Sequence, residues 1–195
     1  RMPEEGSLMP VLTGKAREEA NAIVARYPSS RSALMPLLYL VQSVEGYVSR
    51  DGLREVAEVL GLTTADVEAV ATFYSMYRFE PAGRYVLSVC TNVSCALLGA
   101  RKLYERAREA LDADPAEVTA VEGITLHEEE CLGACEQAPV VQVNYRNYAR
   151  MTAERLDELV ESLRGGEPLP PEGETAVPGD LRETSRSLAG LGASE

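Results

Sequence analysis

Four cysteines are the residues of this chain with the most evident chemistry, because they lie in one stretch as two closely spaced pairs. The pairs are Cys90 with Cys95, and Cys131 with Cys135. The apolar run 85–89 predicts a buried strand that delivers the first pair to a loop. The small residues between the second pair let the chain turn tightly there. Four thiols that converge from two loops would hold a metal centre.

Three kinds of chemistry compete for these cysteines. Disulfide bonds need an oxidising compartment, and the visible N-terminus carries no apolar signal segment. Structural zinc and dithiol redox sites commonly use Cys-x2-Cys pairs. Here four residues lie between the cysteines of the first pair and three between those of the second. Iron–sulfur clusters tolerate varied spacing, and Cys-x4-Cys with a later pair is one pattern that ligates a [2Fe–2S] cluster. The spacing favours the cluster and leaves zinc, disulfide and dithiol chemistry open.

Charged and polar residues surround the second pair. The acidic ones are Glu128, Glu129, Glu130 and Glu136. If these carboxylates lie close to a cluster and are ionised, they would disfavour its reduced state and lower its reduction potential. The alternative is that they are solvated at the surface and have no effect on the cluster. His127 is the only histidine, and with four thiols available we expect an ordinary polar residue rather than an iron ligand. Pro139 stands before a predicted strand, where a cis and a trans peptide are both compatible with the sequence.

Composition limits the partners of the chain. It has 195 residues and a formal net charge of −12, so nucleic acid and anionic membrane surfaces are not expected partners. An apolar fraction of 45% is enough for a core, and the longest apolar runs are too short to span a bilayer. We therefore expect a soluble protein in a reducing compartment, the cytoplasm, with no direct membrane insertion.

Residues 13–80 show helical periodicity and predict an N-terminal helical bundle, after a flexible leader at 1–12. Its four helices are expected to begin near Thr13, Ser32, Asp51 and Thr63, with Asp51 as the cap of the third helix. Thr63 with Asp66 resembles a capping box. The aromatic stretch 73–79 follows, and we interpret it as an apolar joint to the next region, with an exposed partner surface as the alternative.

Residues 84–166 predict a small α/β layer. Strands are expected at 85–89, 124–126 and 139–144, and 145–150 is expected to pair with the last of them as a hairpin. One helix is expected from Cys95 to about Leu111, with Leu98 available for packing, and a second from Thr152 to Gly165. This order is compatible with a thioredoxin-like sheet. Residues 167–195 are rich in Pro, Gly, Ser and Glu and predict a disordered or partner-ordered tail.

Three stretches are similar to those of a known family: Cys90-x4-Cys95, 130–140 with the sequence Glu-Cys-Leu-Gly-Ala-Cys-x3-Pro-Val, and 71–77 with the sequence Ala-Thr-Phe-Tyr-Ser-Met-Tyr. They resemble the small [2Fe–2S] subunit of respiratory complex I, the thioredoxin-like ferredoxin of its NADH-oxidising module. The resemblance covers about residues 14–165. It implies an α/β fold in which a thioredoxin-like [2Fe–2S] ferredoxin domain follows an N-terminal helical bundle.

The resemblance also implies a function. The four cluster ligands would be Cys90, Cys95, Cys131 and Cys135, and the chain would be an electron-transfer subunit of proton-translocating NADH:quinone oxidoreductase, without catalytic side chains of its own. FMN and NADH would be bound by a partner flavoprotein, and a large iron–sulfur subunit would be a second partner. The assembly would form a peripheral arm on the cytoplasmic side of a membrane. Equivalent subunits of NAD-linked hydrogenases or formate dehydrogenases and, less favoured, a zinc-stabilised interaction module remain alternatives.

Overall fold

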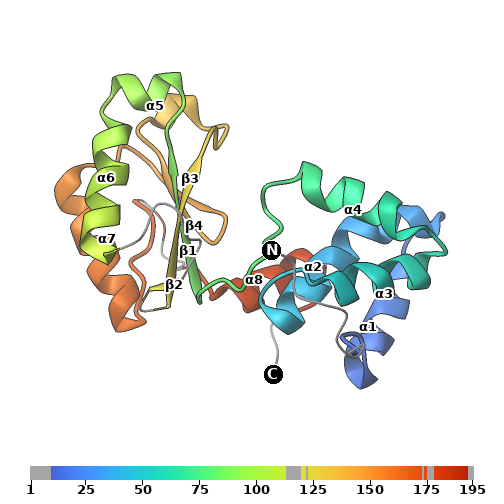
Figure 1. The fold of residues 1–195 in the computed structure, drawn as a ribbon. Helices are drawn as coiled ribbons and strands as arrows, with labels where there is room; N and C mark the ends of the chain where they lie inside the picture. The colour runs from blue at the N-terminus through green and yellow to red at the C-terminus, as the bar shows by residue number, and fades with distance from the viewer. Residues whose placement is uncertain (1–9, 113–119, 122, 173, 175–177, 193–195) are drawn as a thin grey trace. The chain divides into compact units, whose positions relative to one another are not determined.

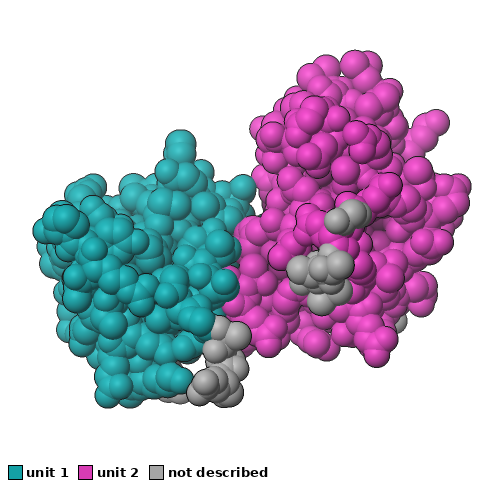
Figure 2. Space-filling view, turned by 180° about the vertical axis from the view of Figure 1, so that it is seen from behind, with its two compact units in different colours: residues 1–80, 185–195 teal, residues 81–184 magenta. Residues whose placement is uncertain are grey.

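The computed structural model describes residues 10–112, 120–121, 123–172, 174 and 178–192 (Figure 1). The chain divides into two compact units, coloured separately in Figure 2: unit 1 comprises residues 1–80 and 185–195, and unit 2 comprises residues 81–184. The change from one unit to the other after Glu80 falls between the predicted regions 13–80 and 84–166. Among the described residues, no helix is both long enough and apolar enough to cross a membrane.

Unit 1 is built from the four helices that the periodicity predicts. They are α1 (Gly14–Val24), α2 (Leu34–Glu45), α3 (Arg50–Leu60) and α4 (Thr64–Phe73), with a 3-10 turn at Ser30–Ala33 before α2. The apolar side of each helix faces a shared core, because residues three and four apart lie on one face of a helix. Fully buried members of this core include Ile23, Leu37, Leu38, Val41, Val56 and Val67.

Two helix starts in unit 1 show how local side chains set the boundaries. The capping box is confirmed: the Thr63 hydroxyl accepts a hydrogen bond from the Asp66 backbone N–H, and the Asp66 carboxylate accepts one from the Thr63 backbone N–H. The prediction that Asp51 caps the third helix is wrong. Ser49 is the N-cap, and its hydroxyl accepts a hydrogen bond from the Gly52 N–H at 2.9 Å. Asp51 lies in the first turn instead.

The aromatic stretch 73–79 divides between the core and the surface. The Tyr77 ring is buried and lies 5.0 Å from the ring of Tyr39, measured between centroids. Its hydroxyl donates a hydrogen bond to the Met35 carbonyl. Phe73, at the end of α4, is exposed. The stretch is therefore part of the core of unit 1 at Tyr77 but not at Phe73.

Unit 2 contains a five-stranded sheet in the order β2-β3-β1-β4-β5. The strands are β1 (Tyr85–Cys90), β2 (Ala120–Val121), β3 (Ile124–Glu129), β4 (Val141–Val143) and β5 (Arg146–Tyr148). β1 and β3 run parallel, and the other neighbouring strands are antiparallel. β1 is buried along its whole length, as expected for a strand whose residues are apolar apart from Ser88.

Helices α6 (Ala100–Leu111) and α7 (Ala153–Gly165) pack against each other on one face of this sheet (Figure 1). A shorter helix, α5 (Val93–Leu97), precedes α6. The single helix predicted after Cys95 is therefore wrong. Gly99 has a φ of +95°, which interrupts the helical backbone between α5 and α6. The expected packing of Leu98 is also wrong, because this side chain is 60% exposed.

The C-terminal residues also differ from the prediction. A tail that is disordered or ordered by a partner is predicted for 167–195, but the structure contains α8 (Leu181–Leu188). In unit 1, the amide of Gln42 donates a hydrogen bond to the Ser185 hydroxyl at 3.0 Å, and both side chains are fully buried. Arg186 pairs with Glu19 through both carboxylate oxygens. These contacts order α8 within the chain itself.

The predicted flexible leader is wrong for the part of it that the structure describes. Val11 and Leu12 are buried, and their backbone N–H groups donate hydrogen bonds to the Glu55 carboxylate at 2.6 and 2.8 Å. A carboxylate that accepts two backbone hydrogen bonds fixes the chain at this point. Residues 1–9 lie outside the described residues.

Unit 2 has its own link to the segment before α8. Asn144 is buried and has a φ of +43°, a backbone conformation that asparagine tolerates better than most residues. Its side chain accepts a hydrogen bond from the Val86 N–H and donates to the carbonyls of Arg84 and Gly179. One side chain therefore joins the start of β1 to the C-terminal segment within unit 2.

The buried pair of Gln42 and Ser185 makes the ordering of α8 testable. Gln42→Leu retains the side-chain volume but leaves the Ser185 hydroxyl and the Arg78 backbone N–H without the hydrogen bonds that they make to Gln42. We expect a loss of about 1–3 kcal/mol in the free energy of unfolding, measured by urea denaturation of the full chain. Gln142→Leu, at a half-buried site on β4, is the control and should cost less. Equal losses would contradict the role assigned to the buried pair.

Candidate metal centre

The parallel pairing of β1 and β3 positions both cysteine pairs. Cys90 is the last residue of β1, and its partner in the register is Glu129, the last residue of β3. Two parallel strands that end together release their loops at the same edge of a sheet. A short loop and the start of α5 separate Cys95 from Cys90, and one residue, Glu130, separates Cys131 from the end of β3. The sheet therefore brings both pairs to one edge, as the sequence predicts.

The first pair lies in an apolar setting. Cys90 and Cys95 are 4% and 2% exposed, and they belong to a small buried cluster with Ala100, Ala134 and Val140. The backbone of Cys90 is fixed by its N–H, which donates to the Val140 carbonyl at 3.1 Å. Burial raises the pKa of the Cys95 thiol to about 11, and the neighbouring Cys90 and Cys135 add to this rise. A thiol in such a place becomes a thiolate most readily when a metal ion compensates its charge.

The second pair lies on an exposed loop. Cys131 and Cys135 are both exposed, and Cys135 opens a 3-10 turn at Cys135–Gln137. Gly133 has a φ of +70°, and its backbone N–H points to the Cys131 sulfur at 3.4 Å. The loop ends at Pro139, whose peptide bond with Ala138 is cis. The tight turn expected around Gly133 is therefore present, and it directs an N–H at a sulfur.

The donor set fits an iron–sulfur cluster. All four cysteines are free thiols, and soft thiolates are the ligands that such clusters use. Within the described ranges, no three Cys, His, Asp or Glu side chains converge closely enough to hold a single metal ion. A [2Fe–2S] cluster requires only two thiolates on each of its irons, which suits two separate pairs. The N–H donated to Cys131 is the kind of hydrogen bond that stabilises charge on a ligating sulfur.

The acidic stretch at the end of β3 has mixed surroundings. The Glu128 carboxylate accepts a hydrogen bond from the Thr91 hydroxyl at 2.8 Å. Glu129 is largely covered, and one of its oxygens lies 3.5 Å from His127 Nε2. Glu130 is exposed. The contact with Glu129 fits the interpretation of His127 as an ordinary polar residue.

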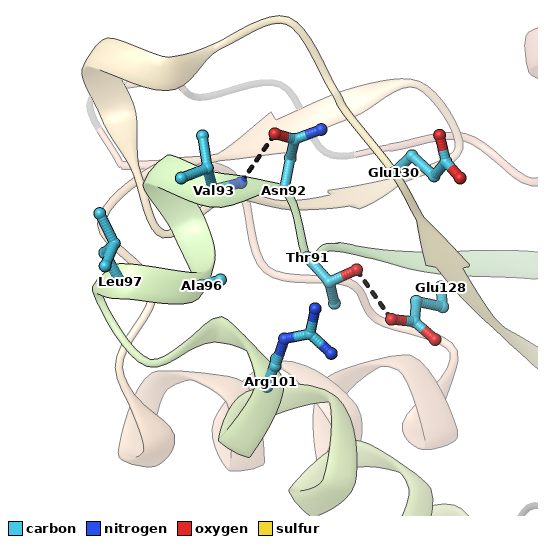
Figure 3. A pocket seen from close by; sticks show the side chains of 8 residues that line it. All are labelled: Thr91, Asn92, Val93, Ala96, Leu97, Arg101, Glu128 and Glu130. Atoms are coloured by element: carbon cyan, nitrogen blue, oxygen red, sulfur yellow. Dashed lines mark hydrogen bonds between the residues drawn. The ribbon is translucent and has the colours of Figure 1, made fainter.

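A hollow of about 860 Å³ lies beside the loop after Cys90. Val93 and Leu97 line one side of it and Glu128 and Glu130 the other, as Figure 3 shows. The guanidinium of Arg101 points toward Thr91 and Glu128. The remaining lining residues are Thr91, Asn92 and Ala96.

The sequence analysis missed this hollow and the exposure of α5. A local signal for the helix start existed in Asn92, whose side chain accepts a hydrogen bond from the Val93 N–H. Gly99 was a signal for an early helix end. No local pattern, however, links Thr91 to Glu128, which lie 37 residues apart in the sequence.

Known proteins similar to this chain agree with its fold. The sequence profile of the thioredoxin-like [2Fe–2S] ferredoxins matches residues 20–164. One NADH-quinone oxidoreductase subunit of Mycobacterium tuberculosis is 44% identical over 185 residues, which cover 95% of this chain and 73% of the relative. NADH-quinone oxidoreductase subunit 2 of Thermus thermophilus is 43% identical over 148 residues, 74% of this chain and 82% of the relative.

A solved structure is similar as well. One chain of an NAD+-reducing [NiFe]-hydrogenase in the air-oxidised state aligns with 75% of this chain, with a TM-score of 0.62 and 25% sequence identity. This chain spans only a quarter of that longer hydrogenase chain. The expected fold and the expected [2Fe–2S] cofactor are thereby confirmed. The chain belongs to the family of thioredoxin-like [2Fe–2S] ferredoxins, together with the NADH-quinone oxidoreductase subunits to which it is similar.

Proposed function

We propose that this chain is the electron-transfer subunit of the NADH-oxidising module of an NADH-quinone oxidoreductase, and that Cys90, Cys95, Cys131 and Cys135 ligate its [2Fe–2S] cluster. The observation that carries the proposal is the parallel pairing of β1 and β3, which brings both thiol pairs to one edge of the sheet. The similarity to the mycobacterial subunit over 95% of the chain supports the assembly.

The residues around the thiols hold and insulate the cluster. When bound, the cluster supplies reversible one-electron chemistry. Cys90 and Cys95 form the inner side of the site, where Val140 and Ala100 exclude water. Cys131 and Cys135 form the outer side, where the Gly133 N–H offsets negative charge on sulfur. No side chain of this chain makes or breaks a substrate bond in this function.

The partners follow from the assembly. The electron is exchanged with FMN on a flavoprotein subunit that also binds NADH, and a large iron–sulfur subunit completes the module. This chain holds neither FMN nor NADH. The module faces the cytoplasm as a peripheral arm of the membrane complex. The similarity to a hydrogenase chain keeps the equivalent module of an NAD-linked hydrogenase as the second candidate, but its identity of 25% is well below the 44% found for the mycobacterial subunit.

The cluster is tested by analysis of anaerobically purified protein. We expect about two irons and two acid-labile sulfides per chain, and a rhombic EPR signal after reduction by dithionite. Zinc without iron or sulfide would contradict the redox function and leave a structural metal module.

The ligand assignment is tested by replacing each cysteine with serine. Serine offers a harder and less readily ionised donor, so each variant should lose iron or shift the visible and EPR spectra. Ser94→Ala lies between the first two cysteines in the sequence and is the matched control, which should keep the wild-type spectrum. An unchanged iron content and spectrum in Cys131→Ser would remove that residue from the ligand set.

The loop geometry is tested at Gly133. An alanine there has open space around its Cβ but must adopt a φ of +70°, which costs about 1 kcal/mol or more. Gly133→Ala should weaken cluster retention by moving the N–H away from Cys131. Gly165→Ala, at a glycine with open space and no positive φ at the end of α7, is the control and should have little effect. Equal cluster loss rates in the two variants during chelator treatment would contradict the role of Gly133.

A further inference from the structure

The chain passes between the two units twice, first after Glu80 and again after Thr184. The backbone differs at these two passages. Residues 79–82 belong to no helix or strand, and we call them the first connection. Residues 182–184 lie inside α8, which begins in unit 2 at Leu181 and ends in unit 1 at Leu188. We call them the second connection.

In unit 1, one side chain holds the ends of both connections. Gln42 is fully buried on α2. Its side-chain oxygen accepts a hydrogen bond from the Arg78 backbone N–H at 2.8 Å, and its amide donates to the Ser185 hydroxyl at 3.0 Å. Arg78 directly precedes the first connection, and Ser185 directly follows the second. Both connections are therefore fixed to the same point of unit 1.

In unit 2, a second buried amide has the same arrangement. The Asn144 side chain donates hydrogen bonds to the carbonyls of Arg84 and Gly179, at 2.9 and 2.8 Å. Arg84 lies two residues after the first connection, and Gly179 lies three residues before the second. The Leu181 backbone N–H donates to the same Arg84 carbonyl at 2.8 Å, and the Leu181 side chain is buried. The two connections are thus joined to each other within unit 2 as well.

The first connection is short and has a flexible type of backbone. It ends at Gly83, whose N–H donates to the Thr125 hydroxyl at 2.9 Å. A Cβ at Gly83 would lie only 2.3 Å from the Gly123 carbonyl oxygen, so the backbone is tightly packed there. Between Arg78 and Gly83 the backbone forms no helix or strand. Its dihedral angles can therefore change without loss of regular secondary structure, as at hinges between domains.

The second connection resists the same kind of change. In α8 the Thr184 N–H donates to the Asp180 carbonyl and the Ala189 N–H to the Ser185 carbonyl, both at 2.9 Å. A bend at 182–184 would break hydrogen bonds of this helix. Because Gln42 and Asn144 tie both connections together at their two ends, a bend in the first connection requires a bend in the second.

We propose that residues 79–82 are a hinge and that α8 is its lock. While residues 182–184 are helical, the two units reorient as one body. When these residues lose their helical structure, the hinge is released and the units reorient independently. The inference concerns motion within the chain and goes beyond the proposed function.

Contacts at its two ends keep α8 helical, which makes the lock reversible. Isolated helices shorter than about 12–15 residues are marginal in water, and α8 has eight residues. At its start, the Asp180 carboxylate accepts a hydrogen bond from the Glu183 N–H at 2.8 Å. Near its end, Arg186 pairs with Glu19, and Ala189 is buried in the core of unit 1. Loss of either group of contacts favours melting of the helix.

The test compares two triple replacements of residues 182–184 in the cluster-loaded full chain. Arg182→Gly, Glu183→Gly and Thr184→Gly together remove helix propensity, whereas alanine at the same three positions removes the same side chains and favours the helix. Neither variant changes Leu181, Ser185 or a cysteine. The measurement is 15N relaxation of amides in both units whose signals the cluster does not broaden, which gives a rotational correlation time for each unit.

We expect one shared correlation time in the wild type and in the alanine variant. In the glycine variant, the correlation time of each unit should shorten toward that of a free domain of its size, because the units no longer tumble together. Two independent correlation times in the wild type would overturn the lock. A glycine variant that tumbles like the wild type, or an alanine variant that is loosened equally, would also overturn it.

The hinge is tested with Pro81→Gly and Ala82→Gly, which increase the backbone freedom of the first connection. With α8 intact, this pair should leave the shared correlation time unchanged. Combined with the three glycines in α8, it should shorten the correlation times by more than the sum of the separate effects, because the two connections act together. Full release by the hinge variant alone would show that α8 is not the lock.

Iron and sulfide content is measured on every variant. Wild-type content in the glycine variant confirms that the thiol-bearing unit is intact, so that a changed correlation time reports the hinge. Protein without iron and sulfide in the wild type would overturn the proposed function, whereas the correlation times alone decide the lock.

Discussion

The pairing of β1 with β3 is the constraint on which the rest of the site depends. Six consecutive residue pairs fix the register, from Tyr85 opposite Ile124 to Cys90 opposite Glu129. Because side chains alternate between the two faces of a strand, a shift by one residue would turn every side chain to the other face. It would also displace the loop of Cys131 relative to Cys90. The apolar core beneath the sheet resists such a shift, since it would bring polar residues inside.

Much of this arrangement could be predicted from the sequence, because its signals are local. β1 is a short apolar run, and Thr63 with Asp66 forms the capping box of α4 within one turn. The same holds for Thr152, where a helix is expected to begin and whose hydroxyl caps α7. The thiols were evident from residue type and spacing alone. Helix caps and periodic patterns involve residues that lie close together in the sequence, so these features can be predicted from the sequence most reliably.

The features that the sequence did not reveal depend on distant residues or on a single backbone angle. Leu98 appeared to continue an apolar helical face, but the positive φ of Gly99 ends α5 and leaves it exposed. The C-terminal segment looked too polar to fold. The Ser185 side chain is nevertheless buried, and its hydroxyl accepts a hydrogen bond from Gln42, which lies 143 residues earlier. Polar residues of this kind become ordered only when a specific distant partner satisfies their hydrogen bonds, and composition carries no information about that partner.

The division of the chain also has a consequence for the order of events during synthesis. Unit 2 is one continuous segment, residues 81–184, inserted between the two parts of unit 1. A ribosome therefore completes the thiol-bearing unit before it has made Ser185, Arg186 and Ala189, which unit 1 needs for its packing. Domains generally fold as units while the chain is being made. Unit 1, which takes residues from both sides of unit 2 in the sequence, is therefore completed only after unit 2 has been made.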